Sequence, residues 1–247
     1  MEKFGFVEKI RYSEMDYDLV LKPSALLQFL QDTASVNAEN LGFGYSFVRE
    51  HGLAWYLLKY RMEFDEYPKD LQEIKINTIP RGYNKIFAFR DFEIFSGDKM
   101  IGRVASTWAL VGFQNDKGMA NASEVLAGKP NMNQFEKLPD DLTYGKIRLP
   151  ESFDIEKTFE IRFEDLDVNC HANNVNYIVW AFEPLGFEFR KTKILKALDI
   201  VFKKEITYGN SVLSQVKIEG NNTVHVLKNA QTDEDLCMIS AEWTDKK

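Results

Sequence analysis

The chain repeats itself once, and this repeat limits the folds that are open to it. The segment Arg11–Asp16 resembles Arg162–Asp167, which lies 151 residues further on, and the likeness continues without a gap. In both copies we expect a short strand that leads through a turn into an apolar helix. These helices, at Ala25–Leu41 and about Asn174–Leu185, are apolar on more than one face, so other structure should wrap them.

Segments with alternating apolar residues follow each helix and predict antiparallel strands. At residues 55–64 the even positions are all apolar, which indicates a half-buried strand. Further strands are expected at residues 71–79, 86–95, 99–113, 197–205, 211–218, 223–230 and 236–243. The predicted fold class is α+β, with two tandem domains that each wrap a long buried helix in a curved antiparallel sheet.

The alternation fades between the two halves, where prolines appear and one short helix is expected near residues 123–127. We therefore expect a first domain at residues 1–128, a linker at 129–152 and a second domain at 153–247. The two halves can pair with each other, and a homodimer of the whole chain is left open.

Charge and cysteine content narrow the class of protein. The net charge of −7 argues against a nucleic acid or an anionic membrane as a general partner. The basic stretch Arg190–Lys204 is a local exception that could receive a phosphate or an acidic protein. Two cysteines without a CxxC spacing fit a reducing compartment. The sequence shows neither a charged-then-apolar leader nor an apolar run that could span a bilayer, so we expect a cytoplasmic protein.

One polar motif precedes the second helix. Asp167, Asn169 and His171 alternate, and in an extended backbone this spacing places all three side chains on one face. A carboxylate, an amide and an imidazole together favour a reaction site, while a polar turn that caps the helix is the alternative reading. Cys170 should then face away from the site and be structural. His51 and His225 show no ligand spacing relative to His171, so neither a metal nor another cofactor is expected.

The motif resembles a known family. The sequence DLDVNCHANNVNYIVWAFE at Asp165–Glu183 is similar to the acyl-acyl carrier protein thioesterases of bacteria and plant plastids. Supporting matches lie at Leu26–Ala34, Leu53–Met62 and Ala105–Trp108. The resemblance covers nearly the whole chain and implies a tandem double hot-dog fold. The absence of a plastid transit peptide before the domain favours the bacterial branch.

The resemblance also implies site residues. Asp167, Asn169 and His171 match three of the family's active-site positions, and the fourth, a glutamate about one strand later, matches Glu205. Ile206 stands where plant members often carry a cysteine, which favours a carboxylate mechanism over a thiol one. Some other hot-dog thioesterases use a carboxylate on the central helix, and Glu183 is the alternative of that kind.

The first copy keeps Asp16 but has Val20 where the second has His171, so we expect one active site per chain. Asp167 is expected to orient His171, and Asn169 to hold substrate or water. Asn173 or Asn174 could cap the second helix, whose first backbone N–H groups, at residues 174–176, are expected oxyanion donors.

The implied reaction is hydrolysis of a fatty acyl thioester carried by acyl carrier protein, with Glu205 activating water or attacking directly. Asn174, Trp55 and Trp108 are the candidate substrate-binding residues, although core packing is the alternative for both tryptophans. Two other functions are left open: hydrolysis of acyl-coenzyme A, and acyl binding without catalysis.

Overall fold

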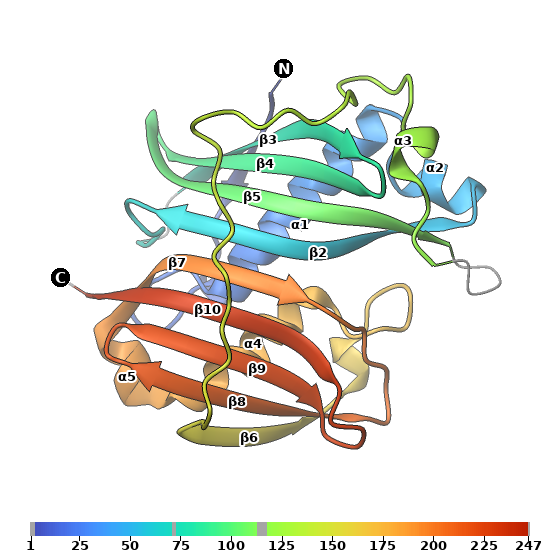
Figure 1. The fold of residues 1–247 in the computed structure, drawn as a ribbon. Coiled ribbons are helices and arrows are strands. Elements are labelled where there is room, and N and C mark those ends of the chain that lie inside the picture. Colours follow the sequence, from blue (N-terminus) through green and yellow to red (C-terminus); the bar gives the residue numbers. More distant parts are fainter. Residues whose placement is uncertain (1–2, 71–72, 113–117, 247) are drawn as a thin grey trace.

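The computed structural model describes residues 3–70, 73–112 and 118–246, in which ten strands form one antiparallel sheet (Figure 1). Leu71, where one strand is expected to start, and Phe113, where another is expected to end, lie outside these residues. Within the described part of the chain, no helix is both long and apolar enough to cross a membrane.

The sheet has the same strand order in both halves, read outward from its centre. The first half runs inward to the centre as β1 (Phe4–Lys9), β3 (Glu73–Asn84), β4 (Phe87–Ser96), β5 (Lys99–Gly112) and β2 (Leu53–Phe64). The second half continues outward as β7 (Lys193–Phe202), β10 (Asp235–Asp245), β9 (Asn222–Asn229), β8 (Ser211–Glu219) and β6 (Ile155–Glu160). The sequence repeat therefore becomes a structural repeat, and its halves join edge to edge between β2 and β7.

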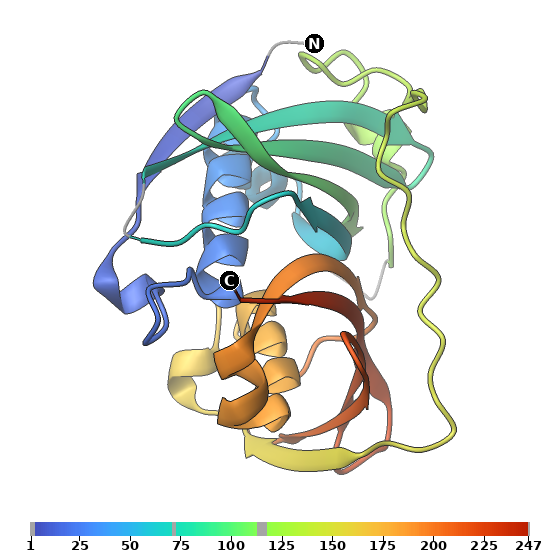
Figure 2. The same cartoon turned by 90° about the vertical axis from the view of Figure 1, so that its left-hand side faces the viewer.

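Each half places its principal helix on the concave side of the sheet (Figure 2). Helix α1 (Pro23–Asn40) begins at a proline, and just beyond its end Gly42 takes a left-handed φ of 74°. Helix α4 (Asn174–Phe182) is shorter than expected, because Pro184 cannot continue an α-helix. The chain continues as the 3-10 turn η3 (Glu183–Leu185) and as α5 (Gly186–Thr192), which was not predicted.

The expected order of strand, turn and helix is confirmed in both copies, since β1 and β6 lead into the 3-10 turns η1 (Tyr12–Glu14) and η2 (Phe163–Asp165), which α1 and α4 follow. Two shorter expectations need correction. The sheet wraps α1 on one side only, since Val36 is 43% exposed. The alternation in β2 changes phase at a bulge between Leu57 and Lys59, so Leu57 faces the core instead of Leu58. The remaining helices are α2 (Tyr45–Glu50) and α3 (Ala122–Val125).

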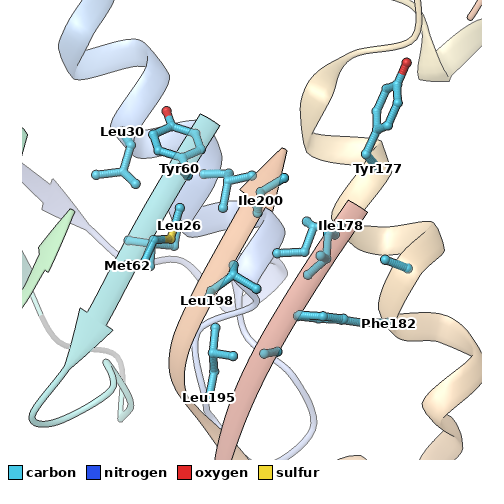
Figure 3. Packing of buried hydrophobic residues seen from close by; sticks show 14 of the residues in the cluster. Leu26, Leu30, Tyr60, Met62, Tyr177, Ile178, Phe182, Leu195, Leu198 and Ile200 are labelled. Carbon is cyan, nitrogen blue, oxygen red and sulfur yellow. The ribbon is translucent and has the colours of Figure 1, made fainter. Parts of the chain in front are cut away.

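The core lies between α1, α4 and the two central strands (Figure 3). Strands β2 and β7 pair over five residues each, Lys59–Glu63 against Ala197–Val201. The buried side chains at this junction come from both halves: Leu26, Leu30, Tyr60, Met62, Ile178, Phe182, Leu195, Leu198 and Ile200. One apolar core therefore spans the repeat.

The linker crosses the sheet on the side opposite the helices (Figure 2). Gly145 donates its N–H to Oδ1 of Asp199 on β7 at 2.9 Å, and Arg61 of β2 contacts Oδ2 of the same carboxylate at 2.6 Å. Asp199 is only 5% exposed. One buried carboxylate thus ties the linker and both central strands together.

Candidate active site

The segment that carries the polar motif is a tight turn. Asp167 accepts hydrogen bonds through Oδ1 from the backbone N–H groups of Asn169, at 2.8 Å, and His171, at 3.2 Å. Its own N–H donates to the carbonyl of His171 at 2.7 Å, and Cys170 takes a left-handed φ of 61°. The predicted extended backbone with three side chains on one face is therefore wrong, because the chain reverses direction between Asp167 and His171.

The first half contains the same turn without a histidine. Asp16 accepts hydrogen bonds through Oδ1 from the N–H groups of Asp18, at 2.9 Å, and Val20, at 3.0 Å. Leu19 has a φ of 56°, like Cys170 at the matching position. Since the aspartate keeps these bonds where no imidazole exists, it holds the turn. Asp167 bonds the backbone of His171, and its expected role in orienting the His171 ring stays a prediction.

The His171 ring lies against Glu205, which the sequence places 34 residues away. His171 Nδ1 and Glu205 Oε2 are 3.0 Å apart, although their alignment falls short of a straight hydrogen bond. Burial raises the pKa of the Glu205 carboxyl, the neighbouring His171 opposes this rise, and the charge of Asp167 adds to it. A carboxylate with a raised pKa is a better proton acceptor than an ordinary glutamate.

Bonds on both sides of Glu205 hold it in place. Ala172 donates its N–H to the carbonyl of Ile206 at 2.9 Å. The hydroxyl of Tyr177, on α4, donates to the carbonyl of Lys204 at 3.2 Å. These bonds fasten the loop after β7 to the turn before α4 and to the helix itself. They thereby fix the distance between the His171 ring and the Glu205 carboxylate.

His171 and Glu205 open into a cavity of about 450 Å³. It lies where β7 ends and its pairing with β2 has stopped. Residues from both halves line it: Tyr56, His171, Lys203, Lys204, Glu205, Ile206, Thr207, Asn210 and Asn229. Asn169 and Asn174 are half-buried and are not among the lining residues.

The start of α4 offers fewer free donors than expected. Asn173 caps the helix, because its Oδ1 accepts the N–H of Val175 at 3.0 Å. The N–H of Asn176 donates to the carbonyl of Asn173 at 2.9 Å. Of the three N–H groups proposed as oxyanion donors, only that of Asn174 has no partner among the described residues.

Two other candidates lie away from this cavity. Glu183, at the end of α4, contacts Lys157 on the edge strand β6 at 3.2 Å. Cys170 is exposed and free. The prediction that it is structural assumed an extended backbone, whereas Cys170 has a left-handed φ. Across residues 3–70, 73–112 and 118–246, no three His, Cys, Asp or Glu side chains gather as metal ligands.

Trp55 and Trp108 line a separate apolar cavity of about 70 Å³ in the first half. It lies between α1 and the sheet, with Ala34 and Ala38 on the helix side. Trp55 Nε1 donates to the carbonyl of Phe43 at 2.9 Å, which fixes its ring. Both tryptophans thus pack in the first half and also line its apolar cavity.

Four lysines of the basic stretch form ion pairs with acidic neighbours. Lys193 and Lys196 contact Asp245 and Glu242 at 2.6 and 2.7 Å near one end of β7. At the other end, Lys203 contacts Asp235 at 2.7 Å and Lys204 pairs with Glu234. The stretch runs from α5 along β7, and its use by a phosphate or an acidic protein stays a prediction.

Comparison with family models shows to which family this chain belongs. Residues 2–128 match the family model of the acyl-ACP thioesterase N-terminal domain, and residues 150–245 match that of the C-terminal domain. The chain belongs to the acyl-ACP thioesterase family.

Curated relatives of this family are distant plant proteins. An acyl-[acyl-carrier-protein] hydrolase of Cuphea viscosissima is 25% identical over 96% of this chain and 61% of its own length. Oleoyl-acyl carrier protein thioesterase 2 of Arabidopsis thaliana is 24% identical over 89% of this chain and 65% of its own length. The chain thus spans less than two thirds of each of these relatives.

Solved structures confirm the tandem hot-dog fold. The 12:0-ACP thioesterase from Umbellularia californica superposes with a TM-score of 0.86 at 18% identity, covering 99% of this chain and 98% of that one. An acyl-ACP thioesterase from Bacteroides thetaiotaomicron gives a TM-score of 0.85 at 20% identity, covering 98% of each chain.

Sequence reasoning about the acyl-ACP thioesterase motif did not single out Tyr56. This residue lies in the supporting match Leu53–Met62, where its place among the apolar even positions predicts a half-buried strand. The cavity of Glu205 that it lines lies where the pairing of β2 with β7 has stopped.

Proposed function

We propose that this protein hydrolyses fatty acyl thioesters of acyl carrier protein. The pairing of His171 with Glu205 in a polar cavity is the observation that carries the proposal. Membership in the acyl-ACP thioesterase family supports the substrate class, as do the names of the curated relatives.

Glu205 acts as the base. Its carboxylate takes a proton from water, and the resulting hydroxide adds to the thioester carbonyl carbon. When the tetrahedral intermediate collapses, the carbon–sulfur bond breaks, and the proton held by Glu205 passes to the sulfur. The products are a fatty acid and the carrier thiol. The raised pKa of Glu205 suits both the uptake and the return of the proton.

His171 favours the ionised form of the Glu205 carboxylate. Its imidazole opposes the rise in the pKa of Glu205 that burial causes. Asp167 contributes by fixing the turn that carries His171. Asn169 is assigned to substrate or water, since it lies in the same turn.

The acyl chain is assigned to the first half. Trp55 and Trp108 line the apolar cavity there. Burial of each methylene stabilises a bound chain by about 0.8 kcal/mol, so the apolar walls of this cavity suit an acyl chain.

Paired substitutions test the site. We expect Glu205→Gln and His171→Ala each to lower kcat/KM on an acyl-ACP at least about a hundredfold while the fold is retained. Glu183→Gln is the matched control, because it removes the same charge at a glutamate outside the cavity. Steady-state assays with a thiol-reactive dye measure the released carrier thiol, and circular dichroism checks folding.

The result that would reject the proposal is near-wild-type turnover in both Glu205→Gln and His171→Ala. A large loss in Glu183→Gln alone would move the catalytic carboxylate to the helix. If the wild type releases no thiol from acyl-ACP or from acyl-coenzyme A at any chain length, the function is acyl binding without catalysis.

A further inference from the structure

The thioester carbonyl needs a hydrogen-bond donor that the second half alone supplies poorly. Charge develops on that oxygen when water adds, and preorganised donors aimed at it are usually a large part of catalysis. Val175 and Asn176 use their N–H groups within the helix start, which leaves that of Asn174. His171 faces Glu205 through Nδ1.

Tyr56 lines the same cavity. It belongs to β2, in the first half, and it lines the cavity together with His171 and Glu205. Pairing between the central strands ends at Lys59, so the Tyr56 side chain lies where β2 and the loop after β7 separate. Ala109 of β5 pairs with Tyr56 and fixes the backbone on the other side.

The Tyr56 hydroxyl is free to act on a ligand. The side chain is half-buried, and none of the residues that the structure describes forms a hydrogen bond with its hydroxyl. Burial raises the pKa of the phenol, and the nearby Glu205 and Cys237 raise it further. The phenol therefore stays protonated near neutral pH and remains a donor.

We propose that the Tyr56 hydroxyl is a catalytic hydrogen-bond donor to the thioester carbonyl oxygen, supplied by the first half to the site of the second. This inference rests on the proposed function. As Glu205 takes a proton from water and hydroxide adds, the carbonyl oxygen becomes an oxyanion that accepts the Tyr56 hydrogen bond. The phenol keeps its proton throughout, and collapse of the oxyanion expels the thiolate, which is protonated as described above.

Two variants separate the hydroxyl from the ring. We expect Tyr56→Phe to lower kcat on acyl-ACP by roughly a hundredfold with little change in KM. Tyr67→Phe is the matched control. Tyr67 does not line this cavity, and its buried hydroxyl has no hydrogen-bond partner among the described residues. This control should turn over substrate like the wild type. If Tyr56→Phe is also like the wild type while Tyr56→Leu is impaired, the ring only packs, and the inference is overturned.

Binding of analogues tests the same contact without turnover. The probes are a ketone analogue of the carrier thioester, in which CH₂ replaces sulfur, and a thioether analogue that lacks the carbonyl. Tyr56→Phe should weaken binding of the ketone by roughly tenfold and leave binding of the thioether unchanged, since only the ketone loses a hydrogen bond. Equal affinities of wild type and variant for the ketone would overturn the inference.

The pH profile separates a second role. If Tyr56 acted only by bonding Glu205, Tyr56→Phe would shift the acid limb of kcat/KM to higher pH and leave the plateau unchanged, which would also overturn the inference. If the wild type hydrolyses no acyl-ACP, the proposed function fails, while the ketone comparison still decides whether Tyr56 binds a carbonyl.

Discussion

At the scale of single residues, Asp167 and Asp16 allow the structural role of a turn aspartate to be compared with its role in catalysis within one chain. Both carboxylates accept two backbone N–H groups of the same kind of turn. Loss of such bonds should lower the free energy of unfolding by about 1–3 kcal/mol, so we expect Asp167→Ala and Asp16→Ala to be destabilised to a similar degree in urea titrations.

Activity should distinguish the two aspartates. Asp167→Ala loosens the turn that carries His171, so kcat/KM should fall, whereas Asp16→Ala should keep the wild-type value because no functional group follows it. Asp167→Asn should recover much of the loss, since its amide oxygen can still accept both N–H groups. A fall in Asp16→Ala as large as in Asp167→Ala would contradict this assignment.

The residues of the site were only partly predictable. The motif around His171 is local, so the sequence shows it directly, and family resemblance pointed to Glu205 across a strand. The pairing of His171 with Glu205 depends on the backbone bond from Ala172 to Ile206, which no spacing reveals. Tyr56 could not be assigned, because its access to the cavity arises where two strands separate.

At the scale of elements, the two principal helices start differently. Asn173 caps α4 through the N–H of Val175, whereas Lys22 at the matching position of α1 makes no side-chain cap and is followed by Pro23. Replacing an asparagine cap by alanine usually costs about 1 kcal/mol. We expect Asn173→Ala to lower the free energy of unfolding by that amount in urea titrations, while Lys22→Ala changes it little.

An Asn173→Ala variant as stable as the wild type would show that the cap bond contributes nothing. Helix boundaries of this kind were readable in the sequence where a proline or glycine marks them, as at Pro23 and Gly42. The break of the second helix at Phe182 was missed because the apolar pattern runs on to Leu185 across Pro184.

At the scale of the whole molecule, the repeat was the most informative feature of the sequence. Two copies of the same elements predict two similar layers, and the mirrored strand order of the sheet follows from that. The sequence did not show that β2 and β7 join the copies into one sheet, since the edge strands of either half could have met. That junction is what brings a first-half residue to a second-half site.

Charge at the cavity mouth should govern the encounter with an acidic carrier. Lys203 and Lys204 line the cavity, but Asp235 and Glu234 neutralise them, and the chain as a whole is negative. Replacing both acids with their amides should free the two lysines. We expect kcat/KM on acyl-ACP to rise on the order of tenfold at low salt, because complementary charge accelerates association.

Matched charge changes elsewhere show whether position matters. Glu242→Gln with Asp245→Asn removes the same two charges near the other end of β7 and should have little effect. The gain from Glu234→Gln with Asp235→Asn should vanish at high salt, where charges are screened within a few ångströms, and should be absent for an uncharged N-acetylcysteamine thioester. Equal gains in both double variants would mean that net charge, and not this mouth, attracts the carrier. A larger gain on acyl-coenzyme A than on acyl-ACP would instead favour the nucleotide thioester as the natural substrate.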